Sequence, residues 1–107
     1  MAKDNKGRAK ARLVSQLSQI RAALVKAGCD TVAKQAVAFG LRRSTTWALL
    51  NQGSRAGPSA KVVKRILSSP VLPVEARRAV EEYIEGKSRG LYGHSEPRSR
   101  AFHDALN

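Results

Sequence analysis

Apolar residues recur near the start of the chain at the spacing of a helix that buries one face. Their steps of four, three and four residues place them all on one side of such a helix. They are Leu13, Leu17, Ile20 and Leu24. The pattern predicts a helix from about residue 8 to residue 27, which Gly28 should end. Asp30 or Thr31 can then cap the following helix.

The segment of residues 32–51 carries two short, apolar, periodic stretches with a glycine between them. Gly40 can adopt the positive φ that a tight turn requires. Ala36 is small where two helices would approach most closely, and Leu41 and Leu49 can fill the angle between them. The pattern therefore predicts two short helices joined by a turn.

The second of these helices begins with polar residues. Residues 42–45, Arg-Arg-Ser-Thr, should face outward, where they can donate hydrogen bonds to phosphates and base edges. Trp47 could rest on the sugar-phosphate backbone or against the neighbouring helix. We expect it to pack in the core, because so short a helix has few other anchors.

Two further helices follow a loop at residues 52–58. Ser59 can cap a helix that runs to about Ser68, and residues 74–85 form another helix, with Gly86 as its stop. The first of them should turn its apolar residues to the core and its cations to solvent. The apolar set is Val62, Val63, Ile66 and Leu67, and the cations are Lys61, Lys64 and Arg65.

The last segment, residues 87–107, reads as a mixed tail. Ser95 could cap a short helix that begins at Pro97. Its apolar members would be Ala101, Phe102, Ala105 and Leu106. The segment would either dock on the core or contact another subunit.

These elements together predict an all-α fold, a compact five-helix bundle over residues 8–86 with a basic arm before it and the tail after it. The arm, residues 1–12, alternates cations with small residues and has nothing to bury, so we expect it to be disordered or frayed. A length of 107 residues fits a single domain of this kind.

The net charge of +12 changes this picture because of where it lies. Residues 1–74 hold 14 Lys and Arg against two acids, a balance of +12, whereas residues 75–107 hold six of each sign. A polyanion partner explains the asymmetry better than a merely solvated surface does. Because the positive part contains the two short helices, we predict nucleic acid as the partner.

Residues 36–51 resemble the DNA-binding helix-turn-helix of the phage lambda repressor superfamily. That pattern has an alanine, a glycine four residues on, an adjacent hydrophobic residue and a closing Ala-Leu-aromatic-Asn. Here these are Ala36, Gly40, Leu41 and residues 48–51, Ala-Leu-Leu-Asn. One departure is Thr46, where the family usually buries Val or Ile. Its hydroxyl should bond to the carbonyl four residues earlier, or the packing should be looser there.

The order of five helices over residues 8–86 is similar to the same superfamily, and it implies a homodimer and an arm that follows the DNA. Tyr83 and Ile84 of the fifth helix are the candidate dimer residues, with core packing as their alternative role. The candidate arm residues are Lys3, Lys6, Arg8, Lys10 and Arg12, with a solvated terminus as the alternative.

We therefore predict a sequence-specific regulator that binds double-stranded DNA, a repressor or autoregulator, with a helix of about residues 43–51 in the major groove. An arginine there can bond both acceptors of guanine, and the small Ala48 leaves room for a thymine methyl. The predicted base-reading residues are Arg43, Ser44, Thr45 and Ala48. The predicted phosphate-binding residues are Lys34, Arg42, Arg55 and Lys61.

Two other functions fit the same sequence. A non-specific RNA-binding or nucleoid-packing protein would use the charge without reading bases. An adaptor, such as the DNA-binding half of a toxin and antitoxin pair, would hold a protein partner through residues 87–107.

The chain has no apolar run of about 20 residues and no signal-peptide core, so the expected location is the cytoplasm or a bacterial nucleoid.

The sequence argues against an enzyme and predicts no cofactor or metal. His94 and His103 lie nine residues apart without a second cysteine beside Cys29, which is a weak basis for zinc. Residues 86–88, Gly-Lys-Ser, look like the end of a P-loop, but the first glycine of that motif would fall at Glu81. The carboxylates of the fifth helix form an exposed row that needs no catalytic role.

Overall fold

The structure is a computed structural model that describes residues 2–52, 57–93 and 96–106, with only the backbone for residues 2–6 and 52. These residues form helices and no strand, so the predicted all-α class is confirmed for them. The helices are α1 (Ala2–Lys26), α2 (Val32–Phe39), α3 (Arg43–Trp47), the π-helical segment η1 (Ala48–Gln52), α4 (Ala60–Leu67), α5 (Val74–Ser88) and α6 (Glu96–Leu106). None of the described helices has the length and hydropathy of a membrane-spanning segment.

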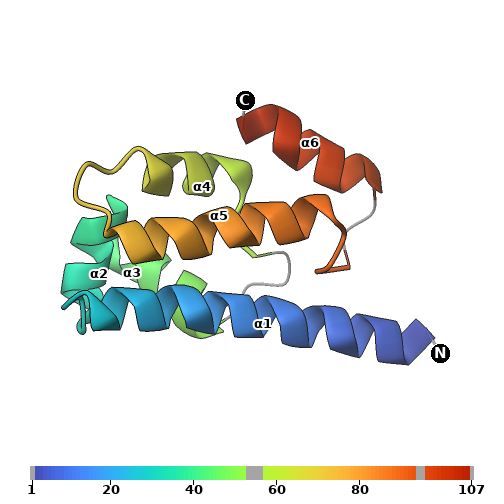
Figure 1. The fold of residues 1–107 in the computed structure, drawn as a ribbon, viewed down its shortest axis with the longest axis horizontal. Coiled ribbons are helices and arrows are strands. Elements are labelled where there is room, and N and C mark those ends of the chain that lie inside the picture. The colour runs from blue at the N-terminus through green and yellow to red at the C-terminus, as the bar shows by residue number, and fades with distance from the viewer. Residues whose placement is uncertain (1, 53–56, 94–95, 107) are drawn as a thin grey trace.

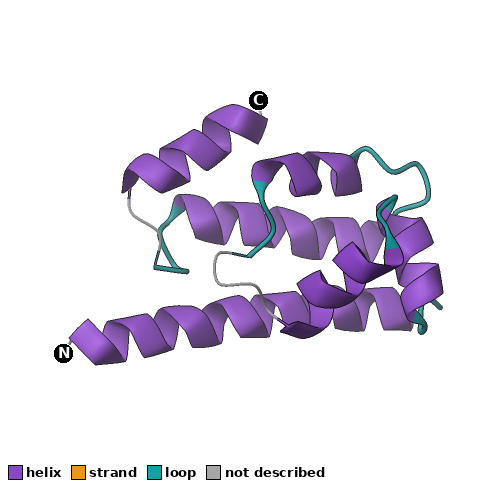
Figure 2. Cartoon of the chain, turned by 180° about the vertical axis from the view of Figure 1, so that it is seen from behind, coloured by secondary structure: helices purple, strands orange, loops and turns teal. Residues whose placement is uncertain are grey.

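The long helix α1 forms one edge of the molecule, and α5 packs along it in the opposite direction (Figure 1). The helices α4 and α6 lie against the other side of α5 and against each other. The short helices α2 and α3 sit near the C-terminal end of α1. Seen from behind, α3 lies in front of the other helices (Figure 2).

The core confirms the stripe predicted for the first helix. Leu13, Leu17, Ile20 and Leu24 are all buried. They pack with apolar residues from α2, η1, α4, α5 and α6, including Phe39, Leu50, Val63, Ile66, Val80, Tyr83 and Phe102. One contiguous core therefore holds all of the helices together.

The expected disordered arm is wrong for residues 2–12, because α1 begins at Ala2 and includes them. Their Ala, Lys and Arg residues have high helix propensity, and the helix that starts in this segment continues into the buried stripe. Ala9 is buried, and Gly93 lies against it. Residues 2–12 have no apolar stripe of their own. They are helical because the later turns of the same helix are anchored in the core.

The expected stop at Gly86 is also wrong, because α5 continues to Ser88. The missing side chain of Gly86 serves a close approach: a Cβ there would lie 2.5 Å from the hydroxyl oxygen of Tyr92. The helix ends before Gly90, which has a φ of +73°. That conformation is the usual role of a glycine just beyond a helix.

The tail forms a helix, α6, as predicted, and it docks on the core through Phe102. The ring of Phe102 meets Tyr83 edge to face at 6.1 Å, and Tyr83 stacks on Tyr92 at 5.3 Å between ring centroids. Ala101 and Ala105, in contrast, are exposed. The predicted apolar face of this helix is therefore narrower than expected.

Lys87 completes this aromatic cluster of Tyr83, Tyr92 and Phe102. It is only 5% exposed, its Nζ lies 4.1 Å from the centroid of Phe102, and it donates a hydrogen bond of 3.3 Å to the hydroxyl of Tyr83. Burial lowers the pKa of the Lys87 ammonium, and the charge of Arg98 lowers it further. The ring faces of the cluster offset part of the cost of burying this cation.

The position of Tyr83 corrects its assignment as a dimer residue. Its side chain is fully buried, and its hydroxyl donates a hydrogen bond of 3.1 Å to the carbonyl oxygen of Pro58. Burial raises the pKa of this hydroxyl, and the neighbouring Tyr92 raises it further. Ile84 is half-buried against the core. A dimer contact would therefore not use the Tyr83 side chain, whereas the partly exposed Ile84 stays a candidate.

Candidate nucleic-acid interface

The turn between α2 and α3 has the geometry that its sequence predicts. Thr31 caps α2 by accepting a hydrogen bond from the amide of Lys34, and Gly40 has a φ of +70°. The amide of Leu41 then bonds to the carbonyl of Ala36 at 3.1 Å, which closes the end of α2. The turn leaves Arg42 in an extended conformation, from which α3 starts.

The face of α3 and η1 that meets the protein is formed by Thr46, Leu49 and Leu50. All three are buried, and the hydroxyl of Thr46 donates to the carbonyl oxygen of Arg42 at 2.9 Å. This is the bond expected for a threonine at a buried helical position, and it satisfies a group that would otherwise cost free energy. The spacing of three and four residues fixes which side of the segment faces the core.

The opposite face carries polar side chains into solvent. Residues 42–45 are all exposed, as predicted. Ser44, Thr45 and Ala48 line a hollow of about 530 Å³ whose other wall comes from Pro58, Ser59 and Val62 at the start of α4. Three of the four residues predicted to read bases therefore share one concave surface, and Arg43 stands exposed on the same helix.

Trp47 is the residue of this region whose environment the sequence analysis mispredicted. Its side chain is 48% exposed instead of packed in the core. The reason lies in the helical geometry, because the anchoring residues Thr46, Leu49 and Leu50 already define the buried face and Trp47 is one position away from it. The three-four spacing of those residues was a signal that could have placed Trp47 outside. Its indole adds a flat, partly apolar donor beside Arg43.

The predicted phosphate-binding residues are not all in one place. Arg42 and Lys61 are exposed, the first before α3 and the second in the first turn of α4. Lys34 instead lines another hollow and pairs with Asp30, whose carboxylate oxygen lies 3.2 Å from its Nζ. Its hydrogen bond to that carboxylate lowers the pKa of Asp30. Arg55 lies outside the described residues.

The described cations of the predicted arm lie on α1. Arg8, Lys10 and Arg12 are exposed on this helix, whose start lies at the end of the molecule opposite α2 (Figure 1). The side chains of Lys3 and Lys6 lie outside the description. Arg8 and Lys10, which are close to that start, therefore do not extend the surface around α3.

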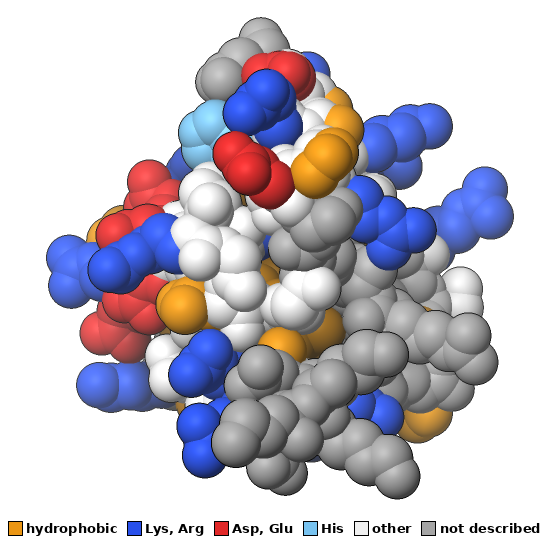
Figure 3. Space-filling model, turned by 90° about the vertical axis from the view of Figure 1, so that its right-hand side faces the viewer, with side chains coloured by type: hydrophobic (Ala, Val, Ile, Leu, Met, Phe, Trp, Pro, Cys, Tyr) orange, Lys and Arg blue, Asp and Glu red, His pale blue; other side chains and the backbone are white. Residues whose placement is uncertain are grey.

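The acidic side chains of α5 form an exposed row. Glu75, Glu81, Glu82 and Glu85 are all exposed along this helix. Figure 3 shows acids on the left side and at the top of the face it presents, with Lys and Arg among them, and further Lys and Arg on its right side. Among the described residues, no group of three or more His, Cys, Asp and Glu is arranged to hold a metal ion.

Comparisons of the chain with models of protein families, with curated proteins and with solved structures find no match. The likeness to the lambda repressor superfamily therefore rests on the pattern of residues 36–51 and on the order of the helices. What the chain does has to be argued from the α3 surface itself.

Proposed function

We propose that this chain is a sequence-specific DNA-binding regulator, a repressor or autoregulator, that places α3 in the major groove. The observation that carries the proposal is the division of α3 and η1 into two faces. Thr46, Leu49 and Leu50 anchor one face, and the hydrogen-bond donors of residues 42–45 occupy the other. A helix held in this way can present its first turn to base edges without losing its position.

Each exposed side chain of α3 has a role that its chemistry supports. Arg43 can bond both the O6 and the N7 acceptors of a guanine. Ser44 and Thr45 offer hydroxyls to base edges, and the small Ala48 leaves space for a thymine methyl. The exposure of Trp47 favours the alternative role left open from the sequence, because its half-exposed indole can lie against the sugar-phosphate backbone and donate its N–H to a phosphate.

The surrounding charges support a polyanionic partner. Arg42 and Lys61 are exposed and close in sequence to Ser44 and Val62, which line the α3 hollow, so they would hold phosphates. Residues 42–52, which form α3 and η1 with the residue before them, contain no acid that would oppose the approach of a duplex. We leave Lys34 out of the interface because its ammonium is already paired with Asp30.

Selection of bound fragments from a random duplex pool tests the proposal directly, and we expect one motif to be enriched. Arg43→Ala should then cost about 1 to 3 kcal/mol on that motif and relax the base choice at one position. Lys61→Ala should weaken all duplexes alike and reduce the slope of binding against salt by about one ion. If no motif is enriched, or if both variants lower specific and random binding by the same factor, α3 does not read bases.

Trp47 gives a second readout, because it is the only tryptophan of the chain. Its fluorescence should change when the selected duplex is added, and Trp47→Phe should abolish the signal and weaken binding. An unchanged spectrum during confirmed binding would remove Trp47 from the interface and leave the other roles in place.

One observation favours a second candidate, a non-specific nucleic-acid binder. The exposed cations Arg8, Lys10 and Arg12 lie along α1, away from α3, and suit a phosphate backbone better than base edges. Under this alternative, replacing these three residues by alanine would reduce binding more than Arg43→Ala does. Under our proposal the order of the two effects is reversed on the selected motif.

A further inference from the structure

The outer side of α4 carries three exposed cations. Lys61, Lys64 and Arg65 occupy positions i, i+3 and i+4 of this helix, which lie on one side of it. The opposite side is buried in the core. We call these three residues the α4 stripe.

The stripe is not neutralised by acids of its own part of the chain. Residues 31–74, which include α2, α3, η1 and α4, contain no Asp and no Glu. In the part of the chain that the structure describes, no ion pair involves a residue of α4. The paired cations there are Lys26, Lys34, Arg89 and Arg100. The charge of the stripe is therefore available to an anion outside the protein.

The helix α4 does not need these cations in order to form. Its first turn is capped by Ser59, whose hydroxyl accepts a hydrogen bond from the amide of Val62, and its buried side anchors it in the core. Like charges three or four residues apart on a helix repel each other, so Lys61 repels both other members of the stripe. Cations that destabilise their own helix and have no acidic partner inside the protein indicate an anionic partner outside it.

The stripe lies beside the hollow that α3 borders. Val62 of α4 lines this hollow together with Ser44 and Thr45. Arg65 follows Val62 by three residues, so the two are neighbours on the surface of α4 and Arg65 lies one turn farther along the same wall. The Lys and Arg on the right side of Figure 3 are on the side of the molecule that faces the viewer in Figure 2, where α3 lies.

We propose that the α4 stripe binds the phosphate backbone of the duplex that receives α3, next to the base pairs that α3 reads. The inference rests on the proposed function and adds Lys64 and Arg65 to the residues that hold the duplex. The guanidinium of Arg65 can bond two oxygens of one phosphate, whereas the ammonium of Lys64 acts as a point charge. Contacts to phosphates contribute affinity and register but no choice of base.

The salt dependence of binding by the full chain provides the test, on the selected duplex and on a random one. Lys64→Gln with Arg65→Gln should reduce the slope of log affinity against log salt by about 1.8, because each phosphate contact contributes about 0.9. Affinity for both duplexes should fall by the same factor, and the selected motif should stay the same. An unchanged slope overturns the proposal and leaves base reading by α3 in place. If no motif is enriched, the proposed function fails, and the slope on random duplexes still decides whether the stripe binds phosphates.

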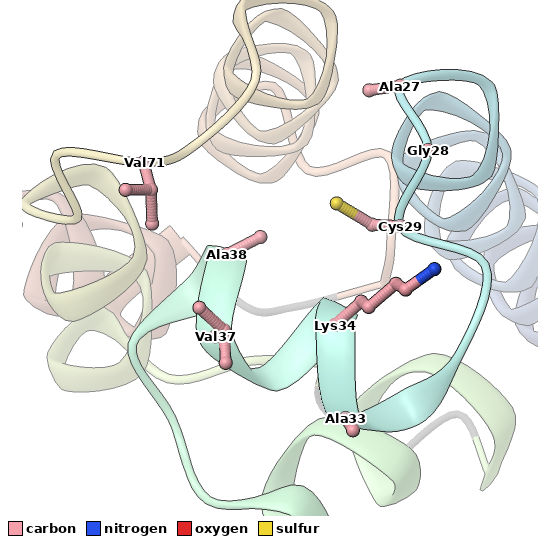
Figure 4. Close-up of a pocket in the computed structure, with 8 residues that line it drawn as sticks. All are labelled: Ala27, Gly28, Cys29, Ala33, Lys34, Val37, Ala38 and Val71. Atoms are coloured by element: carbon pink, nitrogen blue, oxygen red, sulfur yellow. The ribbon is translucent and has the colours of Figure 1, made fainter.

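Lys10→Gln with Lys34→Gln is the matched control, because it removes two positive charges outside the stripe. Lys10 is exposed near the start of α1, and Lys34 pairs with Asp30 beside the apolar hollow shown in Figure 4. This variant should change the slope much less, since charges far from the duplex are screened at physiological salt. An equal effect of the two variants would mean that only net charge matters, and it would overturn the proposal. Urea unfolding should show that neither variant is less stable than the wild type.

Uncharged methylphosphonate linkages in the duplex locate the contact. When single phosphates are replaced one at a time, some positions outside the motif should weaken the wild type but not the Lys64→Gln, Arg65→Gln variant. Equal losses for both proteins at every position contradict a backbone contact by the stripe. A slope change that occurs only with double-stranded RNA would assign the stripe to RNA and also overturn the proposal.

Discussion

Aromatic side chains are used in opposite ways at the two ends of the molecule. At the α5–α6 end, Tyr83, Tyr92 and Phe102 pack against one another and enclose the ammonium of Lys87. At the α2–α3 end, the single tryptophan, Trp47, stands half in solvent. The first arrangement buries its rings and its ammonium group and so stabilises the fold. The second leaves the indole accessible from solvent.

The same contrast appears in the polar groups. The hydroxyl of Tyr83 and the ammonium of Lys87 are bonded to each other inside the protein, whereas residues 42–45 point into solvent beside a hollow. The two regions therefore carry different tasks: the aromatic cluster supports the fold, and α3 is available for a partner. A substitution in one region can therefore be used to measure whether the other region depends on it.

The largest expected effect comes from Phe102→Ala. Removing a buried aromatic ring should destabilise the protein by about 3 to 5 kcal/mol, because it leaves a cavity and uncovers Lys87. Urea unfolding monitored by circular dichroism measures the loss. Ala105→Ser, on an exposed position of the same helix, should stay within about 0.5 kcal/mol. A loss below 1 kcal/mol for Phe102→Ala would mean that α6 is not part of the cooperative core.

Gly86→Ala should have the next largest effect, because its new methyl group would lie 2.5 Å from the Tyr92 hydroxyl oxygen. Overpacking of this kind costs about 1 to 3 kcal/mol. Combining it with Tyr92→Phe removes the hydroxyl oxygen but keeps the ring carbon Cζ, which would lie at 2.8 Å, so it should recover part of the loss. Equal stabilities for the single and double variants would show that the contact is not tight. Binding to a selected duplex, measured on folded protein, should not change.

Gly40→Ala should cost about 1 to 2 kcal/mol for a different reason, the strain of a side chain at positive φ. Space is not limiting, since the nearest atom to the new methyl group would be the Cβ of Ser69 at 3.9 Å. Gly40→Asn should cost less, because asparagine tolerates this conformation. Both variants should also weaken DNA binding beyond what unfolding explains. Equal costs for alanine and asparagine would exclude the strain argument.

The smallest effect is a pH dependence that arises from Lys87. Its pKa is lowered in the folded protein from the value of 10.5 in an unstructured chain. The unfolded state therefore binds more protons between the two values, and stability should rise as the pH increases toward 10.5. The rise is measurable only below the ordinary tyrosine pKa of 10.0, because ionisation of Tyr83 and Tyr92 in the unfolded chain then opposes it.

Lys87→Met is the variant that isolates this effect. Methionine retains an unbranched apolar side chain but has no proton to release, so the rise of the unfolding free energy with pH should disappear. Chemical denaturation at several pH values provides the measurement. A variant with the same slope as the wild type would assign the pH dependence to other groups.

The helices were predictable where their pattern is local. The four-three-four stripe of α1, the Thr31 cap, the turn at Gly40 and the Ser59 cap are each set by residues a few positions apart, and the structure has all of them. The exposure of residues 42–45 follows from the same local periodicity. Short-range physics therefore accounts for the positions of α2, α3 and α4.

The predictions were wrong where a contact with a residue far away in the sequence determines the structure. Gly86 reads as a helix stop until Tyr92 is seen to occupy the space beside it. For Tyr83 the sequence leaves a dimer contact and core packing as alternatives, and the contact with Phe102 of α6 places it in the core. The segment of residues 2–12 reads as an arm because its own side chains bury little, and its helix is held by the turns that follow. The spacing of apolar and polar residues within these segments does not indicate such contacts.

The hydrogen bond from Tyr83 to the carbonyl oxygen of Pro58 connects the aromatic cluster to the hollow beside α3. Pro58 forms part of the wall opposite Ser44 and Thr45, and the ring that holds its carbonyl is the ring that α6 covers. The width of the opening beside α3 is thus set in part by a segment far along the chain that contributes no atom to it. Removing or displacing α6 should therefore change the shape of the hollow beside α3.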